Sequence, residues 1–127
     1  MPQTVILTAG APAPGGPYSQ AIASSNILAI SGQVGINPAT GEAPAGVIAQ
    51  ARQALANLEA ILAAAGAKKR DVVKTTCFLT DINDFPIFNE EYKAFFGDHR
   101  PARSTFGVQL FGGYVVEIEA LAVLSNC

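Results

Sequence analysis

Histidine, cysteine, tryptophan and charged residues are all scarce in this chain of 127 residues. It has one histidine, two cysteines and no tryptophan, and charged residues make up only 14% of it. Protein zinc sites draw on several histidine or cysteine ligands, and the chain has no Cys-x-x-Cys pair, so the sequence argues against a metal site. A Ser-His-Asp triad would have to use His99, which follows Asp98 in an expected loop with no serine indicated beside it.

The cysteines and the apolar segments bear on where the protein works. Cys77 and Cys127 do not suggest a disulfide framework, and Cys77 lies in an apolar run where a buried thiol is expected. No segment approaches the ~18 apolar residues of a membrane span. The first residues lack the charged and then apolar pattern of a signal peptide. We therefore expect a cytoplasmic protein that does not enter a membrane.

The length and the net charge limit the number of domains and the kinds of partner. The chain is long enough for one hydrophobic core and too short for two, so we expect a single domain over residues 1–127. A net charge of −2 provides no electrostatic footprint for a nucleic-acid backbone. Half of the residues are hydrophobic, and so low a charge density favours an oligomer that hides part of its surface.

Hydrophobic periodicity predicts the element order β-β-β-α-β-α-β-β. Steps of three and four residues predict a helix over 47–65, and an aromatic stripe of core side chains predicts a shorter helix between Asp84 and Gly97. Runs of β-forming residues predict strands at 3–7, 19–24, 27–34 and 71–80, a strand through Arg103, and a last strand over 114–124. These elements predict an α+β fold, a two-layer sandwich with two helices on one face of a mixed six-stranded sheet.

The last two strands are expected to be neighbours, joined by a hairpin at Phe111-Gly112-Gly113. If Leu110 pairs with Tyr114, then Gly107 lies opposite Glu117 and Arg103 lies opposite Leu121. Arg103 and Glu117 would then be roughly 13 Å apart along the sheet. They could share a site only through long side chains or across subunits, and Glu119 would be the nearer carboxylate.

One face of the last strand is chemically mixed. Glu117 and Glu119 alternate onto the same side as Leu121 and Val123. A face open to water would not need the two aliphatic side chains, and the core of a monomer would not tolerate unpaired carboxylates. We expect this face to be buried against a partner subunit, with a polar pocket in the seam.

Arg103 is the residue on which a functional site would depend. A guanidinium group matches a carboxylate with two parallel hydrogen bonds, so Arg103 could hold an acidic ligand. The alternative is an internal ion pair with Glu117 or Glu119. Gly32 interrupts an apolar strand, which indicates either a bulge or a point where a ligand approaches the backbone.

Several motifs along nearly the whole chain resemble the reactive intermediate/imine deaminase A (RidA) family, also called YjgF/YER057c/UK114. They include Gly16-Pro17-Tyr18-Ser19-Gln20, Ser31-Gly32-Gln33, Asn89 with Tyr92, Pro101-Ala102-Arg103-Ser104 and Glu117-Ile118-Glu119-Ala120. The last two together form the family signature. The resemblance implies a homotrimer of chorismate-mutase-like subunits, with a ligand site in each cleft between subunits and no cofactor.

The resemblance also implies a reaction. Family members hydrolyse 2-imino acids, such as 2-iminopropanoate and 2-iminobutanoate, to 2-oxo acids and ammonia. On this chain, Arg103 would grip the substrate carboxylate and Glu117 would hold the attacking water. The pocket would be lined by Tyr18, Ser31, Gly32, Asn89 and Thr105.

Two other functions stay open at this point. The protein could bind a 2-oxo or amino acid without turnover, as a regulatory protein, or it could be an endoribonuclease and translation inhibitor, against which its acidic balance argues. The sequence also departs from the family pattern. Leu110-Phe111-Gly112-Gly113 stands where a Leu-Pro-Lys-type turn is usual, and Thr105 stands where cysteine is frequent.

Overall fold

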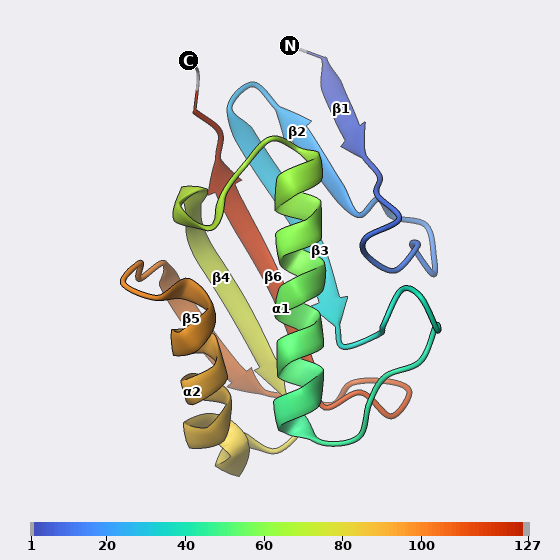
Figure 1. Ribbon diagram of the computed structural model, residues 1–127, viewed down its shortest axis with the longest axis vertical. Coiled ribbons are helices and arrows are strands. Elements are labelled where there is room, and N and C mark those ends of the chain that lie inside the picture. The colour runs from blue at the N-terminus through green and yellow to red at the C-terminus, as the bar shows by residue number, and fades with distance from the viewer. Residues whose placement is uncertain (1, 126–127) are drawn as a thin grey trace.

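The computed structural model describes residues 2–125, and Cys127 lies outside them (Figure 1). The elements are β1 (Gln3–Ile6), β2 (Ala21–Ser24), β3 (Ile27–Val34), α1 (Val47–Ala64), β4 (Val72–Leu79), α2 (Phe85–Phe96), β5 (Ala102–Gly107) and β6 (Val116–Val123). Short 3-10 turns at Lys69–Asp71 and Ile82–Asp84 precede β4 and α2. This order, with six strands in one mixed sheet, confirms the predicted α+β class.

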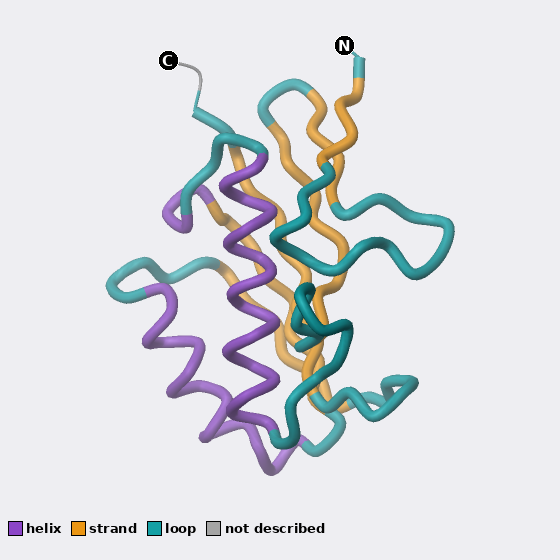
Figure 2. Tube along the Cα trace, turned by 45° about the vertical axis from the view of Figure 1, so that its right-hand side comes forward, coloured by secondary structure: helices purple, strands orange, loops and turns teal. Residues whose placement is uncertain are grey.

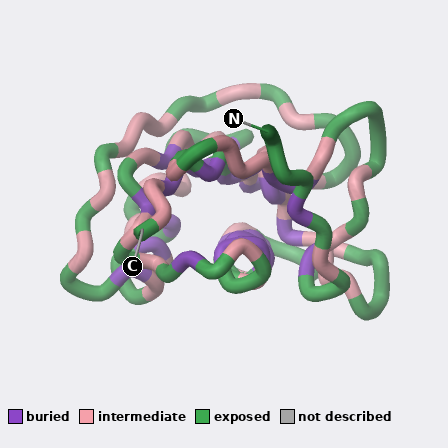
Figure 3. Tube along the Cα trace, turned by 90° about the horizontal axis from the view of Figure 1, so that it is seen from above, coloured by how far each residue is buried: buried purple, intermediate pink, exposed green. Residues whose placement is uncertain are grey.

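Both helices cover the same face of the sheet. The view from above shows two layers with the buried residues between them (Figure 3). α1 turns its apolar stripe inward, so that Ala51, Leu55, Leu58 and Leu62 are almost fully buried. Gly66 ends the helix in the left-handed region at φ 78°, where a residue without a Cβ is not strained. No helix in the described part is long and apolar enough to cross a membrane.

The strand order β1-β2-β3-β6-β4-β5 corrects the expected pairing of the last two strands. β4 lies between β5 and β6, parallel to β5 and antiparallel to β6. Glu117 pairs with Phe78 and Val34, and Arg103 pairs with Thr75. The predicted hairpin and its register were therefore wrong.

The connection between β5 and β6 crosses the end of β4. The backbone N–H of Val108 donates to the carbonyl of Leu79 at 2.9 Å, and the N–H of Thr80 donates to the carbonyl of Val115 at 3.2 Å. The helical connection through α2 makes β5 a parallel neighbour of β4. Because β5 takes one edge of β4, β6 pairs with the other, and the chain has to pass over the end of β4 to reach it. Gly112 and Gly113, in a short segment between two strands, suggested a hairpin. The topology instead depends on which strands pair across the whole sheet.

Three buried amide side chains hold the loops to this framework. Gln20 accepts from the N–H of Thr8 at 2.7 Å and donates to the carbonyls of its loop. Gln50 accepts from the N–H of Val115 at 2.9 Å, and Asn57 donates to the carbonyls of Val34 and Ile36. These bonds fix the loops that extend to one side of the strands in Figure 2.

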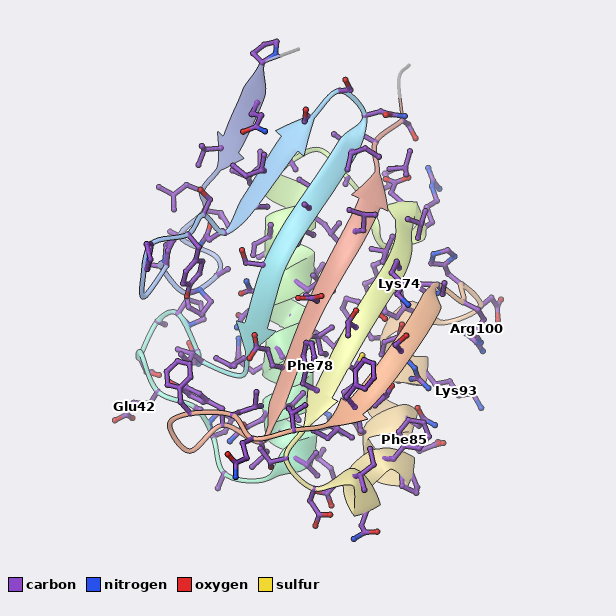
Figure 4. All side chains as sticks on the ribbon, turned by 180° about the vertical axis from the view of Figure 1, so that it is seen from behind. Glu42, Lys74, Phe78, Phe85, Lys93 and Arg100 are labelled. Carbon is purple, nitrogen blue, oxygen red and sulfur yellow. The ribbon has the colours of Figure 1, made fainter. Side chains whose placement is uncertain are left out.

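No helix within residues 2–125 covers the second face of the sheet (Figure 4). Lys74 and Phe78 lie on this bare face, together with Glu117, Glu119 and Leu121. The predicted mixture of carboxylates and apolar side chains is therefore present. The burial of this face against a partner stays a prediction.

The contact between β3 and α1 predicts unequal effects of the same substitution at two glycines. A Cβ on Gly35 would lie 2.6 Å from the backbone oxygen of Gln50, whereas a Cβ on Gly113 would meet nothing within 4 Å. We expect Gly35→Ala to lower the free energy of unfolding by roughly 1–3 kcal/mol or more, because neither backbone can yield cheaply. Gly113→Ala is the matched control and should leave stability nearly unchanged. Urea unfolding at one fixed protein concentration checks this, and equal midpoints for the two variants would contradict the close approach.

Candidate functional site

Arg103 is held against the helical layer by aromatic rings of α2. Its guanidinium carbon lies 4.7 Å from the ring centre of Tyr92 and 5.3 Å from that of Phe85. The hydroxyl of Tyr92 is in turn 2.7 Å from that of the fully buried Thr75. Cation–π attraction and this hydrogen bond therefore orient a positive charge on the helix side of β5.

A cavity of about 390 Å³ opens at Arg103, and we call it the Arg103 cleft. Three of its side chains are cationic and one is anionic; the lining residues are Asn89, Glu90, Tyr92, Lys93, Arg100, Pro101 and Arg103. Figure 4 shows Lys93 and Arg100 along this edge of the molecule, beside α2 and β5. Arg103 forms no ion pair with any residue between 2 and 125, so the alternative of an internal ion pair with Glu117 or Glu119 was wrong. The cleft is therefore suited to an anion.

Two polar atoms on the same side of the structure lack partners. Asn89 Oδ1 and Thr105 Oγ1 are buried and make no hydrogen bond. Thr105 follows Arg103 by two positions on β5, so both side chains point to the same face. Buried polar atoms are nearly always paired, so a ligand with an N–H or O–H donor would relieve the cost of burying them. Of the predicted site residues, Asn89 and Arg103 thus line the same cleft, and Thr105 lies on the same face of β5 as Arg103.

The other predicted residues meet in a second cavity, of about 680 Å³, which we call the Glu117 hollow. Tyr18, Ser31, Gly32 and Glu117 all line it. Gly32 lies where the register between β3 and β6 shifts, which agrees with a bulge, one of the two interpretations of this glycine. A Cβ on Gly32 would lie 1.9 Å from Oε2 of Glu117. The glycine is therefore what makes room for the Glu117 carboxylate.

Two effects raise the pKa of the Glu117 carboxyl group. Partial burial raises the pKa of its carboxyl group, and repulsion from the Glu119 carboxylate raises it further. The two residues are two positions apart on β6 and both line the hollow. A carboxylate with a raised pKa takes up a proton more readily, which suits a group that activates water near neutral pH.

Tyr18 and Ser31 are held by their own loop. The hydroxyl of Tyr18 accepts a hydrogen bond from the N–H of Gly15 at 3.1 Å, and the Ser31 hydroxyl donates to the carbonyl of Ser19 at 2.6 Å. Ser31 N–H also donates to the carbonyl of Gln20. These bonds fasten the tip of the loop to the bulge in β3, so the wall of the Glu117 hollow is formed before any ligand arrives.

The Arg103 cleft and the Glu117 hollow lie on opposite faces of the sheet. Arg103 is beside Thr75, whose side chain contacts α2, whereas Glu117 is beside Phe78 on the bare face. One copy of the chain therefore holds the seven predicted site residues as two separate groups. Neither Glu117 nor Glu119 is on the side of the sheet from which Arg103 projects.

Comparison with known proteins agrees with this architecture. The family model described as Endoribonuclease L-PSP matches residues 8–124. A protein of Escherichia coli K12 named 2-iminobutanoate/2-iminopropanoate deaminase is 51% identical over 122 residues, which cover 93% of this chain and 95% of the relative. The chain belongs to the endoribonuclease L-PSP family, also known as YjgF/RidA.

Solved structures of the YjgF/RidA family share the fold. The crystal structure of the YjgF gene product of E. coli has a TM-score of 0.91 at 50% identity, covering 94% of this chain and 98% of that one. E. coli TdcF, solved with bound serine, has a TM-score of 0.93 at 44% identity, covering 96% of this chain and 99% of that one. A member of this family has therefore been observed with a small amino acid bound.

Sequence reasoning missed the role of the two aromatic side chains beneath Arg103. Tyr92 was assigned to the core with the rest of the α2 stripe, and it is indeed buried, but its ring also supports the guanidinium. The sequence did contain a signal for this contact, because Phe85 and Tyr92 are about two turns apart on α2, the helix that precedes β5. His99 contacts the carbonyl of Val72 at 2.7 Å through Nε2, and no cluster of potential metal ligands occurs between residues 2 and 125.

The repulsion of Glu117 by the Glu119 carboxylate predicts a change in titration. Glu119→Gln removes the neighbouring negative charge, so the pKa of Glu117 should fall while burial still keeps it above the ordinary value. Carbon-13 NMR of the glutamate carboxyl groups would measure the shift. Glu42→Gln changes a carboxylate on a loop away from the sheet and is the control (Figure 4). An unchanged or higher pKa in Glu119→Gln would refute the proposed repulsion.

Proposed function

We propose that this chain hydrolyses 2-imino acids, such as 2-iminopropanoate and 2-iminobutanoate, to 2-oxo acids and ammonia. The observation that carries the proposal is Arg103, a preoriented cation with no anionic partner in the described chain. It shares its cleft with Asn89 and its strand face with Thr105, and the side-chain oxygens of both residues are unpaired. A 2-imino acid offers the matching groups, a carboxylate and an N–H donor. The similarity to relatives named as imine deaminases supports the same assignment.

The active site would form between two copies in a homotrimer. Arg103, Asn89 and Thr105 of one copy would face Tyr18, Ser31, Gly32 and Glu117 of the next. The bare sheet face supports this arrangement, because it carries apolar side chains such as Phe106 and Leu121 that remain exposed in one copy. Closure of the seam would also exclude water and strengthen the contact between Arg103 and the carboxylate.

In this arrangement the guanidinium group of Arg103 binds the substrate carboxylate through two parallel hydrogen bonds. The aromatic rings beneath it limit its rotation, so the substrate is held in one orientation. The oxygens of Asn89 and Thr105 accept hydrogen bonds from the imine nitrogen and stabilise its protonated form, whose C2 is more electrophilic than that of the neutral imine. Positioning therefore supplies most of the rate enhancement.

Glu117 transfers the proton that the reaction moves from water to the imine nitrogen. Its carboxylate takes a proton from a water molecule as the water oxygen bonds to C2, which gives a carbinolamine. The carboxyl group then returns that proton to the nitrogen, and as the C2–N bond breaks the carboxylate takes the hydroxyl proton of the carbinolamine. Ammonia leaves, the 2-oxo acid remains, and the proton left on Glu117 passes to ammonia or to solvent. The raised pKa of Glu117 favours its acting in both directions.

Binding without turnover is the second candidate function, and the bound serine in E. coli TdcF favours it. The same Arg103 would then hold a 2-oxo or amino acid, and the protein would report the level of that metabolite. Saturable binding of 2-oxobutanoate, measured by calorimetry, without any acceleration of imine hydrolysis would establish this function instead.

Arg103 variants test the carboxylate contact. We expect Arg103→Ala to reduce kcat/KM for 2-iminobutanoate about 100-fold or more, a loss of roughly 3 kcal/mol, since a charged hydrogen-bonded pair disappears. Arg103→Lys should also lose most activity, because an ammonium group cannot make the two-pronged contact. The assay couples the protein to a threonine dehydratase and follows ammonia release. Arg70→Ala, an exposed arginine outside both cavities, is the control; an Arg103→Ala protein as fast as wild type would exclude the assignment.

Glu117→Gln tests the proton transfer. The amide is nearly the same size as the carboxylate but cannot take a proton, so kcat should fall by about 10²–10⁴-fold while KM changes little. The pH profile of the wild-type protein should show activity rising through a pKa above that of an ordinary glutamate. Unchanged kcat in Glu117→Gln would show that another group activates the water.

A further inference from the structure

The Glu117 hollow is larger and more apolar than a small imino acid requires. Its volume of about 680 Å³ is within the range of cavities that hold drug-sized ligands, well above the volume of 2-iminopropanoate. Besides its polar groups, the hollow is lined by apolar residues, which are Pro12, Ala13, Val34, Ile36, Phe111 and Tyr114. The lining therefore offers a wall that a methyl or ethyl side chain would not fill.

The part of this wall nearest the solvent is an aromatic pair. Phe111 is 85% exposed, whereas Tyr114 is half-buried, and their rings meet edge to face with centres 6.0 Å apart at 87°. Glu117 is half-buried in the same hollow, so the carboxylate lies deeper than the exposed Phe111 ring. The exposed Phe111 ring is apolar surface that a ligand bound in the hollow would remove from water.

The backbone of the turn holds the aromatic pair in place. Gly112 has φ 68°, and a Cβ at this position would lie 2.9 Å from the Tyr114 ring. The N–H of Tyr114 donates to the carbonyl of Gly112 at 3.1 Å, which closes a tight turn. At its other end the N–H of Val115 is bound by the buried Gln50. Phe111 is therefore presented by a fixed turn.

We propose that the Phe111–Tyr114 pair is a specificity determinant that selects 2-imino acids with large apolar or aromatic side chains. The inference rests on the proposed function, because it places the reacting carbon near Glu117 and the substrate side chain along the aromatic wall. Contact with Phe111 and Tyr114 removes apolar surface from water, and edge-to-face packing favours a third ring. Imino acids derived from phenylalanine and leucine are then better substrates than the one derived from alanine.

The test compares imino acids made in situ from phenylalanine, leucine and alanine by an L-amino-acid oxidase. The measured quantity is kcat/KM for imine hydrolysis, and the readout is the ratio of the phenylalanine-derived to the alanine-derived substrate. We expect this ratio to exceed one in the wild-type protein and to fall about tenfold in Phe111→Ala, as is typical for the loss of an apolar contact. Phe111→Tyr should keep the ratio. Leu7→Ala alters another strongly exposed apolar side chain outside the hollow and should also keep it.

The possible outcomes separate the two proposals. If the wild-type protein hydrolyses the alanine-derived imine but Phe111→Ala leaves the ratio unchanged, the specificity assignment is overturned and the proposed function stands. If Phe111→Ala loses all substrates alike and also sediments differently, Phe111 serves assembly and the specificity assignment is again overturned. If the wild-type protein accelerates hydrolysis of none of the three imines, both proposals fail.

Discussion

The contact between the Arg103 guanidinium and the Tyr92 ring is the interaction on which the candidate site depends. It keeps a full positive charge on the helical side of β5, within a cleft that contains more cations than anions. The hydroxyl of Thr75 holds the ring, and Thr75 is itself buried between the sheet and α2. The core of the protein and the orientation of the Arg103 guanidinium are thus parts of the same packing arrangement.

The sheet topology explains why a single copy cannot complete the proposed site. Because α2 connects parallel neighbours, β5 occupies the outer edge and β6 is inserted on the inner side of β4. Arg103 then points toward α2, while Glu117 points to the face that no described helix covers. A site that uses both side chains requires a second copy, and the exposed apolar residues of the bare face give such an association a driving force.

The sequence was informative where local signals agree with the fold. The 3.6-residue period gave α1, and the alternation along β6 correctly put Glu117 and Glu119 on one face and Ile118 and Ala120 on the other. The bulge at Gly32 was one of two interpretations that the sequence allowed, because a glycine inside an apolar strand marks either a bulge or a ligand contact. Each of these features is decided by neighbours within a few residues along the chain.

The sequence was uninformative where distant segments compete for the same edge. The turn after Leu110 has the composition of a hairpin, and only the pairing of β6 with both β3 and β4 shows that it is a crossing loop. The division of the site residues between two faces follows from that topology. The resemblance to the YjgF/RidA family implies a single site for those residues, whereas in one copy Asn89 and Arg103 line one cavity and Tyr18, Ser31, Gly32 and Glu117 line another.

Mixing two inactive proteins tests most directly whether the site is shared between copies. Arg103→Ala and Glu117→Gln chains, carrying different affinity tags, are refolded together in equal amounts and purified as mixed assemblies. If Arg103 of one copy acts with Glu117 of the next in a trimer, every mixed assembly keeps one intact site of its three, and about a third of wild-type activity should return. Mixed assemblies as inactive as the parent variants would contradict a site formed by two copies.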